Sequence, residues 1–159
     1  MKENLSRSSR RIQDLLSALG TNLEVVELPS TTRTAAEAAS AIGCSVEQIA
    51  KSILFRTVKD EKPVMVIASG VNRVNEARIA EFAGEPIEKA DASYVREKTG
   101  FVIGGVPPIG HAEPIYTIID EDLLMVGEIW AAAGTPHSVF KLSATSLLDI
   151  TGGVPKPIK

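Results

Sequence analysis

The sequence is poor in the residue types on which many enzymes depend. It contains one cysteine, Cys44, and two histidines, His111 and His137. A single cysteine cannot form an internal disulfide, and no HExxH or paired CxxC pattern is present, so we expect no metal and no cofactor. Neither a Walker loop nor the GxSxG turn of serine hydrolases occurs. A Ser-His-Asp triad built from distant positions stays open, although no motif signals one.

The sequence also lacks an excess of positive charge. The 159 residues carry 17 basic and 20 acidic side chains, which gives a net charge of -3. This balance argues against a protein that binds nucleic acid by bulk electrostatics, but it leaves room for a local basic patch. No apolar run approaches the length of a membrane span, and the opening MKENLSRSSRR lacks the apolar core of a signal peptide. With so little cysteine, the cytoplasm is the expected location.

What the sequence does contain is enough apolar material for a folded core. Hydrophobic residues make up 44% of the chain, and we expect a single domain over residues 1–159. Spacing and capping residues predict helices over 8–19, from 34 onward, and over 45–50, 75–83, 91–100 and from 143 onward. Strands are predicted over 23–28, 51–57, 63–69, 115–120, 128–133 and 138–142. Because strands and helices interleave and several turns are short, a mixed sheet is favoured over a purely parallel one.

The most informative stretch is GFVIGGVPPIGH, residues 100–111. Its three apolar residues before the paired glycines suit the end of a strand. Gly104 and Gly105 let a backbone approach a ligand closely because they carry no Cβ atom, and Pro107 and Pro108 then fix the chain. The stretch predicts a preshaped wall of main-chain groups, and a tight surface turn is the alternative.

A lysine stands on the apolar face of a predicted strand. Side chains alternate along a strand, so Lys51 shares a face with Ile53 and Phe55, whereas Ser52 and Arg56 lie on the other face. One interpretation is a lysine whose stem packs and whose ammonium reaches water. The functional interpretation is an ammonium that anchors an anion, above all a phosphate.

Together, Lys51 and the glycine-proline loop predict a site with a cation and a main-chain wall but no evident nucleophile. Such a site binds anionic ligands, and it can hydrolyse an activated ester if a hydroxyl of the substrate positions the water. The protein then supplies orientation and oxyanion stabilisation. We expect both features to border one hollow, with the ammonium facing the loop.

Two charged clusters are expected to be solvated. The carboxylates of Asp120, Glu121 and Asp122 follow a predicted strand and suit a turn better than an acid-base pair. The arginines of the first helix are expected to form a solvated face, and a contact to a phosphate backbone is the alternative.

Several segments, in order and at suitable spacing, resemble the YbaK/prolyl-tRNA-synthetase editing-domain family. They are IAKS at 49–52, GVNRVN at 70–75, TG at 99–100, GGVPP at 104–108 and TIID at 117–120. Each is weak alone, but together they extend over nearly the whole chain from about residue 34 to residue 153. The resemblance implies an α/β (α+β) fold with a mixed, largely antiparallel sheet, curled into a barrel-like form and surrounded by helices.

The resemblance also implies a trans-editing aminoacyl-tRNA deacylase, which hydrolyses the ester of a tRNA charged with the wrong amino acid, often tRNA for proline. It implies that Lys51 holds the terminal adenosine, that the loop 104–108 places the aminoacyl group, and that the 2′-hydroxyl of that adenosine assists the water. The catalytic candidates are Lys51, Gly104, Gly105, Val106, Pro107 and Pro108, and the substrate-binding candidates are Ser52, Ser69, Gly70 and His137. The expected partner is the acceptor end of an aminoacyl-tRNA, and a synthetase is a second candidate partner.

The chain departs from the usual family pattern at Val71, Arg78 and Pro107 and over 134–138. These departures leave open which amino acid is removed, and the oligomeric state is open as well. Two other functions also stay open. One is a non-catalytic module that docks the acceptor end of tRNA or a synthetase, and the other is a small-molecule enzyme of another class.

Overall fold

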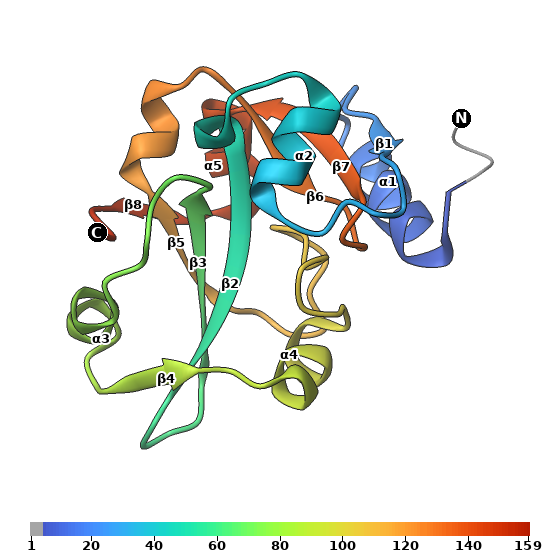
Figure 1. Ribbon diagram of the computed structural model, residues 1–159. Coiled ribbons are helices and arrows are strands. Elements are labelled where there is room, and N and C mark those ends of the chain that lie inside the picture. Colours follow the sequence, from blue (N-terminus) through green and yellow to red (C-terminus); the bar gives the residue numbers. More distant parts are fainter. Residues whose placement is uncertain (1–4) are drawn as a thin grey trace.

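The computed structural model describes residues 5–159, which form one curled, mixed sheet with helices packed around it (Figure 1). The strands follow the order β1-β7-β6-β2-β3-β5-β8, and β4 pairs with β2 beside this path. Their bounds are β1 Val25–Glu27, β2 Ile49–Thr57, β3 Pro63–Ser69, β4 Ile87–Lys89, β5 Tyr116–Asp120, β6 Glu128–Ala132, β7 Ser138–Ser143 and β8 Val154–Lys156. Four strand pairs are antiparallel and three are parallel. The predicted mixed sheet is confirmed, with antiparallel pairs slightly in excess.

The helices begin and end at local signals in the sequence. They are α1 Arg7–Ala18, α2 Ala35–Ile42, α3 Glu76–Ala83, α4 Ala92–Thr99 and α5 Ala144–Thr151, with 3₁₀ turns η2 Val46–Gln48 and η3 Glu121–Met125. The side chains of four predicted N-caps accept a first-turn backbone hydrogen bond: Thr34, Asn75, Asp91 and Ser143. In the part of the chain that the structure describes, no helix is long and apolar enough to cross a membrane.

Three features differ from the prediction. The helix expected over 45–50 is only the short turn η2, because β2 already begins at Ile49. Two strands of three residues each, β4 and β8, were not predicted. The apolar residues before Gly104 are not a strand end: they belong to the loop after α4, where the Phe101 amide donates to Thr99 Oγ1 and the Phe101 ring is buried in the core.

Strand β2 separates two parts of the hydrophobic core. Ala50 and Leu54 belong to the larger cluster, whereas Phe55 belongs to a second cluster on the opposite face, with Ile53 packed against it. The predicted alternation is therefore confirmed, and it places Lys51 on the face of the second cluster. Strand β3 is buried along nearly its whole length between β2 and β5, as its apolar sequence predicts.

One edge of β2 carries a gap in the sheet. Along its other edge, β2 pairs with β3 over Ala50–Arg56. On the gapped edge it pairs with β6 only at Ile49 and Ala50, and with β4 only from Phe55 to Thr57. The residues between these two pairings are Lys51 to Leu54. The Leu54 carbonyl accepts a hydrogen bond from the Ala90 amide at 3.2 Å, which leaves Lys51 to Ile53 with no strand beside them on this edge. This gap is where the candidate site lies.

Candidate active site

Two adjoining cavities lie at the gap in the sheet. The β4-side cavity, of about 240 Å³, is lined by β2, the end of β4, Val95 of α4 and the loop around Ile103. The α2-side cavity, of about 200 Å³, is lined by β2, the start of α2, Trp130 of β6 and Pro136. Four residues line both cavities: Lys51, Ser52, Gly104 and Val106. The predicted lysine and the predicted loop therefore border the same hollow.

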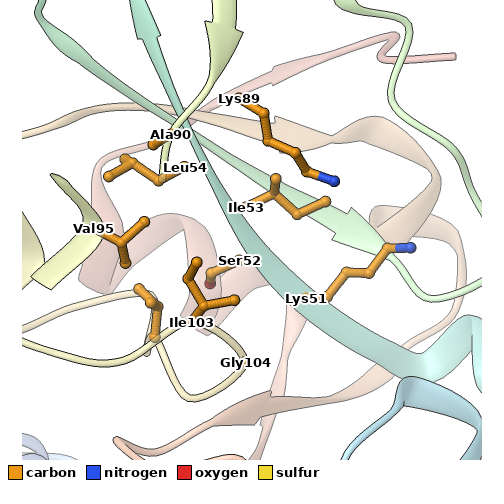
Figure 2. Close-up of a pocket in the computed structure, with 10 residues that line it drawn as sticks. Lys51, Ser52, Ile53, Leu54, Lys89, Ala90, Val95, Ile103 and Gly104 are labelled. Atoms are coloured by element: carbon orange, nitrogen blue, oxygen red, sulfur yellow. The ribbon is translucent and has the colours of Figure 1, made fainter. Parts of the chain in front are cut away.

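The Lys51 ammonium does not point toward the loop, contrary to our expectation. Figure 2 shows the side chains of Lys51 and Lys89 extending to one side of β2, whereas Ser52, Leu54 and Ile103 lie on the other side. The reason is the alternation of side chains along β2, which turns residue 51 and residue 52 to opposite faces. The hollow thus has a cationic side and a largely apolar side, and the strand runs between them.

The electrostatics of Lys51 follow from this position. Partial burial, and then the positive charge of Lys89, lower the pKa of Lys51 below the usual value of a lysine, while the Asp120 carboxylate acts in the opposite direction. Among residues 5–159, neither lysine forms an ion pair with a carboxylate. Two neighbouring cations without a counter-charge are suited to an anionic ligand.

The glycine-proline loop packs against segment 134–138. The Gly105 amide donates to the Val102 carbonyl at 3.0 Å, and the Gly105 carbonyl accepts from the Gly134 amide at 3.0 Å. A Cβ atom on Gly105 would lie 2.6 Å from Thr135 Cα, so glycine is required there by the neighbouring chain. The close approach that Gly105 allows is thus to Thr135 rather than to a ligand. Gly104, with a φ of 90°, faces the cavities instead.

Segment 134–138, which supports the loop, is itself in contact with α1. A Cβ atom on Gly134 would lie 2.9 Å from the Ser8 carbonyl oxygen. The Ser9 hydroxyl donates to Ser138 Oγ at 2.7 Å, and both residues are fully buried. The main-chain wall is therefore connected through this segment to the N-terminal helix.

Ser52 carries an unusual hydroxyl. Its Oγ atom is buried and has no hydrogen-bond partner anywhere in residues 5–159. It lies where the two cavities meet, on the side of β2 that also carries Leu54 and Ile103 (Figure 2). A buried hydroxyl without a partner costs about 1–3 kcal/mol, so its place at a cavity wall suits a group that bonds to a ligand.

The other predicted site residues have different places. Pro107 and Pro108 are buried and border neither cavity, and the Pro107 carbonyl lies 2.7 Å from His111 Nε2. The Ser69 hydroxyl donates to the Glu47 carbonyl at 2.8 Å.

Two more candidates also lie outside the cavity walls. Gly70 packs so tightly that a Cβ atom would lie 2.5 Å from the Val46 carbonyl oxygen. His137 does not line either cavity, and its Nε2 lies 4.0 Å from a carboxylate oxygen of Glu27. The geometry therefore brings together Lys51, Ser52, Gly104 and Val106 and leaves the remaining candidates in supporting positions.

The carboxylate of Asp120 is not solvated, so that prediction is wrong. Asp120 is 1% exposed, and its Oδ2 accepts hydrogen bonds from the Ser69 amide at 3.0 Å and from Asn72 Nδ2 at 2.8 Å. The donors come from the end of β3 and the turn after it, so nothing in the sequence around residue 120 signals this burial. Sequence reasoning missed two charged residues of the hollow. Lys89 lines the β4-side cavity and was missed because β4 itself was not predicted, and Arg33 lines the α2-side cavity.

Most of the chain matches one known protein family. The family model described as the aminoacyl-tRNA editing domain matches residues 29–150, and the chain belongs to this family. The match confirms the resemblance found in its sequence segments.

Three relatives place the chain within this family. A crystal structure of a protein proposed as a trans-editing enzyme for prolyl tRNA synthetase is 44% identical, with a TM-score of 0.94, and the match covers 98% of this chain and 99% of that one. The uncharacterized protein YwhH of Bacillus subtilis is 28% identical over 128 residues, which cover 80% of this chain and 81% of YwhH. The proline–tRNA ligase of Xanthomonas campestris is 28% identical over 131 residues, or 82% of this chain. The chain spans only 23% of that ligase.

Proposed function

We propose that this protein hydrolyses the ester of an aminoacyl-tRNA that carries a small, wrong amino acid, with tRNA for proline as the preferred carrier. The observation that carries the proposal is the divided hollow, in which a cationic side and an apolar side meet at Ser52 and Gly104 (Figure 2). A charged acceptor end has the same two parts: phosphates on one side of the terminal ribose and an amino acid on the other. The lysine holds the nucleotide, and the apolar side receives the amino acid.

The apolar side limits the size of the amino acid. The β4-side cavity measures only about 240 Å³ in all, and its apolar side is formed by Leu54, Val95, Ile103 and Val106. Such walls suit alanine, serine, cysteine or 2-aminobutyrate. A hydrophobic pocket separates ligands that differ by one methylene by about 1–3 kcal/mol, so graded rates across this series are expected.

The chemistry relies on the substrate. Among the described residues that line the two cavities there is no cysteine, histidine or carboxylate, so Ser52 has no neighbouring base that would make it a nucleophile. In the proposed step, the 2′-hydroxyl of the terminal ribose positions a water molecule. The water oxygen bonds to the ester carbonyl carbon, and the bond between that carbon and the ribose oxygen breaks. The ribose oxygen takes one proton of the water, and the amino acid leaves as a carboxylate while the other proton passes to solvent. The main chain at Gly104 and Val106 orients the aminoacyl group. Holding the ester in the reactive geometry lowers the barrier to hydrolysis.

The test is a deacylation panel on one tRNA for proline, charged in turn with alanine, serine, cysteine, 2-aminobutyrate and proline. We expect hydrolysis of the small, wrong esters and sparing of the prolyl ester. Lys51→Ala should lower kcat/KM by about 10²-fold or more, while Lys59→Ala, a change at an exposed lysine away from the cavities, should leave it unchanged. Circular dichroism and thermal unfolding establish that both variants are folded.

Two results would overturn the proposal. If every mischarged tRNA survives at high protein concentration while binding is tight, the protein is the non-catalytic docking module instead. If Lys51→Ala is folded and fully active, Lys51 does not hold the substrate.

A further inference from the structure

Strand β4 brings a second lysine to the cationic side of the hollow. Lys89 is the last residue of β4 and lies directly opposite Phe55 of β2 in the antiparallel pairing. Residues opposite each other in such a pair project to the same face. Phe55 shares its face with Lys51, four residues earlier on β2, so both lysines belong to one face of the sheet. Figure 2 shows their ammonium groups turned to the same side, with Ile53 between them.

The two ammonium groups repel each other. The charge of Lys89 is among the causes that lower the pKa of Lys51, and no carboxylate within residues 5–159 forms an ion pair with either. The Asp120 carboxylate acts on Lys51 in the opposite direction, but it already accepts hydrogen bonds from the Ser69 amide and Asn72 Nδ2. An anion placed between the lysines therefore adds two attractions that offset their mutual repulsion.

The structure assigns Lys89 and Lys51 to a two-lysine clamp for a single phosphate, and we propose that this is the phosphodiester on the 5′ side of the terminal nucleotide. This assignment rests on the proposed function. The phosphate and the aminoacyl ester of that nucleotide are attached to opposite ends of one ribose. With the phosphate on the lysine side, the ribose crosses the unpaired edge of β2 at residues 51–53 and delivers the ester to Ser52 and Gly104.

The position of Lys89 explains why a lysine is useful at the end of so short a strand. Lys89 is exposed and lines the β4-side cavity. A lysine contributes a compact point charge, and one phosphate accepts hydrogen bonds from two such groups. A clamp built from two strands also fixes the phosphate in direction, which one flexible lysine cannot do. The consequence is a defined distance between the phosphate and the ester.

The test uses binding of uncharged oligonucleotides, so that it does not depend on hydrolysis. The probes are the trinucleotide CCA and the same trinucleotide with a neutral methylphosphonate at its last linkage. Lys89→Met removes the charge but keeps an apolar stem, Lys89→Arg keeps the charge, and Lys59→Met is the matched control at an exposed lysine outside both cavities.

We expect Lys89→Met to weaken binding of CCA about five- to tenfold and to reduce the slope of log K against log salt by about 0.7. The same variant should bind the methylphosphonate probe as the wild type does. Lys89→Arg should retain most of the affinity for CCA, and Lys59→Met should retain all of it. Equal affinity of Lys89→Met and wild type for CCA would overturn the clamp. Equal weakening on both probes would also overturn it, because Lys89 would then act on a different group.

The clamp and the proposed function fail in distinguishable ways. Loss of selectivity for the phosphate in Lys89→Met, together with no deacylation of any charged tRNA, would support the clamp and reject the hydrolase. Deacylation without any effect of Lys89 on the CCA probe would reject the clamp alone.

Discussion

Replacement of Ser52 by alanine should make the protein more stable and less active. The Ser52 hydroxyl is buried without a partner in the described chain, so the folded state bears its desolvation cost. The unfolded state bears no such cost, because water bonds to the hydroxyl there. Alanine removes the hydroxyl and leaves the β2 backbone and its pairing with Ile67 of β3 unchanged.

The size of the effect follows from the burial. An unsatisfied buried hydroxyl costs about 1–3 kcal/mol, and Ser52→Ala removes this cost. The substitution also removes one packed atom, and the lost packing cancels part of the stabilisation. We therefore expect Ser52→Ala to raise the free energy of unfolding by about 1 kcal/mol, or Tm by about 2–4 °C for a chain of this size. If the hydroxyl bonds to the substrate, kcat/KM should fall about 3- to 10-fold, the value of one neutral hydrogen bond.

The assay pairs thermal and urea unfolding with deacylation of the best substrate from the panel. Ser143→Ala is the matched control, because the Ser143 hydroxyl accepts from the Ser146 amide at 3.1 Å and caps α5. That change should lower stability by about 1 kcal/mol and leave activity alone. The two serine-to-alanine changes thus have opposite predicted effects on stability, and only Ser52→Ala is predicted to lower activity.

Either of two results would refute the reasoning about Ser52. Destabilisation of Ser52→Ala by 1 kcal/mol or more, on the scale of a lost hydrogen bond, would mean that the hydroxyl is satisfied in the folded protein. Higher stability with unchanged kcat/KM would mean that the hydroxyl does not contact the substrate.

Two further predictions concern Gly105 of the glycine-proline loop and the ammonium group of Lys51. Gly105→Ala should destabilise the protein by about 1–3 kcal/mol and impair deacylation, because its Cβ would meet the Thr135 main chain at 2.6 Å; unchanged urea unfolding would contradict this. In an NMR titration of lysine Cε signals, the pKa of Lys51 should lie below the usual lysine value, because of burial and the charge of Lys89. It should rise in Lys89→Met, since a repelling charge is removed, and an unchanged pKa in that variant would show that the two groups do not interact.

Helix boundaries could be predicted because their causes are local. Asp91 and Ser143 accept hydrogen bonds from amides three residues away, and Gly84 and Gly100 reverse the backbone with φ values of 83° and 85°. The strands β4 and β8 have three residues each and depend on their partners β2 and β5, so no periodicity within them signals a strand. For the same reason, the place of Lys89 at the end of β4 could not be predicted from the sequence.

The candidate site was predicted in part for the same reason. Alternation along β2 placed Lys51 on the correct face, and this needs only the strand itself. The relation of its ammonium to the loop depends on how the chain after α4 passes the gap in the sheet, which involves residues far apart in the sequence. The environment of Asp120 is similar, since the donors to its Oδ2 atom, Ser69 and Asn72, are about 50 positions away.

The link between α1 and the loop has a consequence for where this protein can be cut. The family match begins at residue 29, after α1 has ended at Ala18. Yet Ser8 and Ser9 touch the segment that holds Gly105 in place. A fragment trimmed to residues 29–150 would thus lose a contact that supports the loop of the candidate site. Excising or grafting this module should therefore start upstream of Ser6, the residue that caps α1.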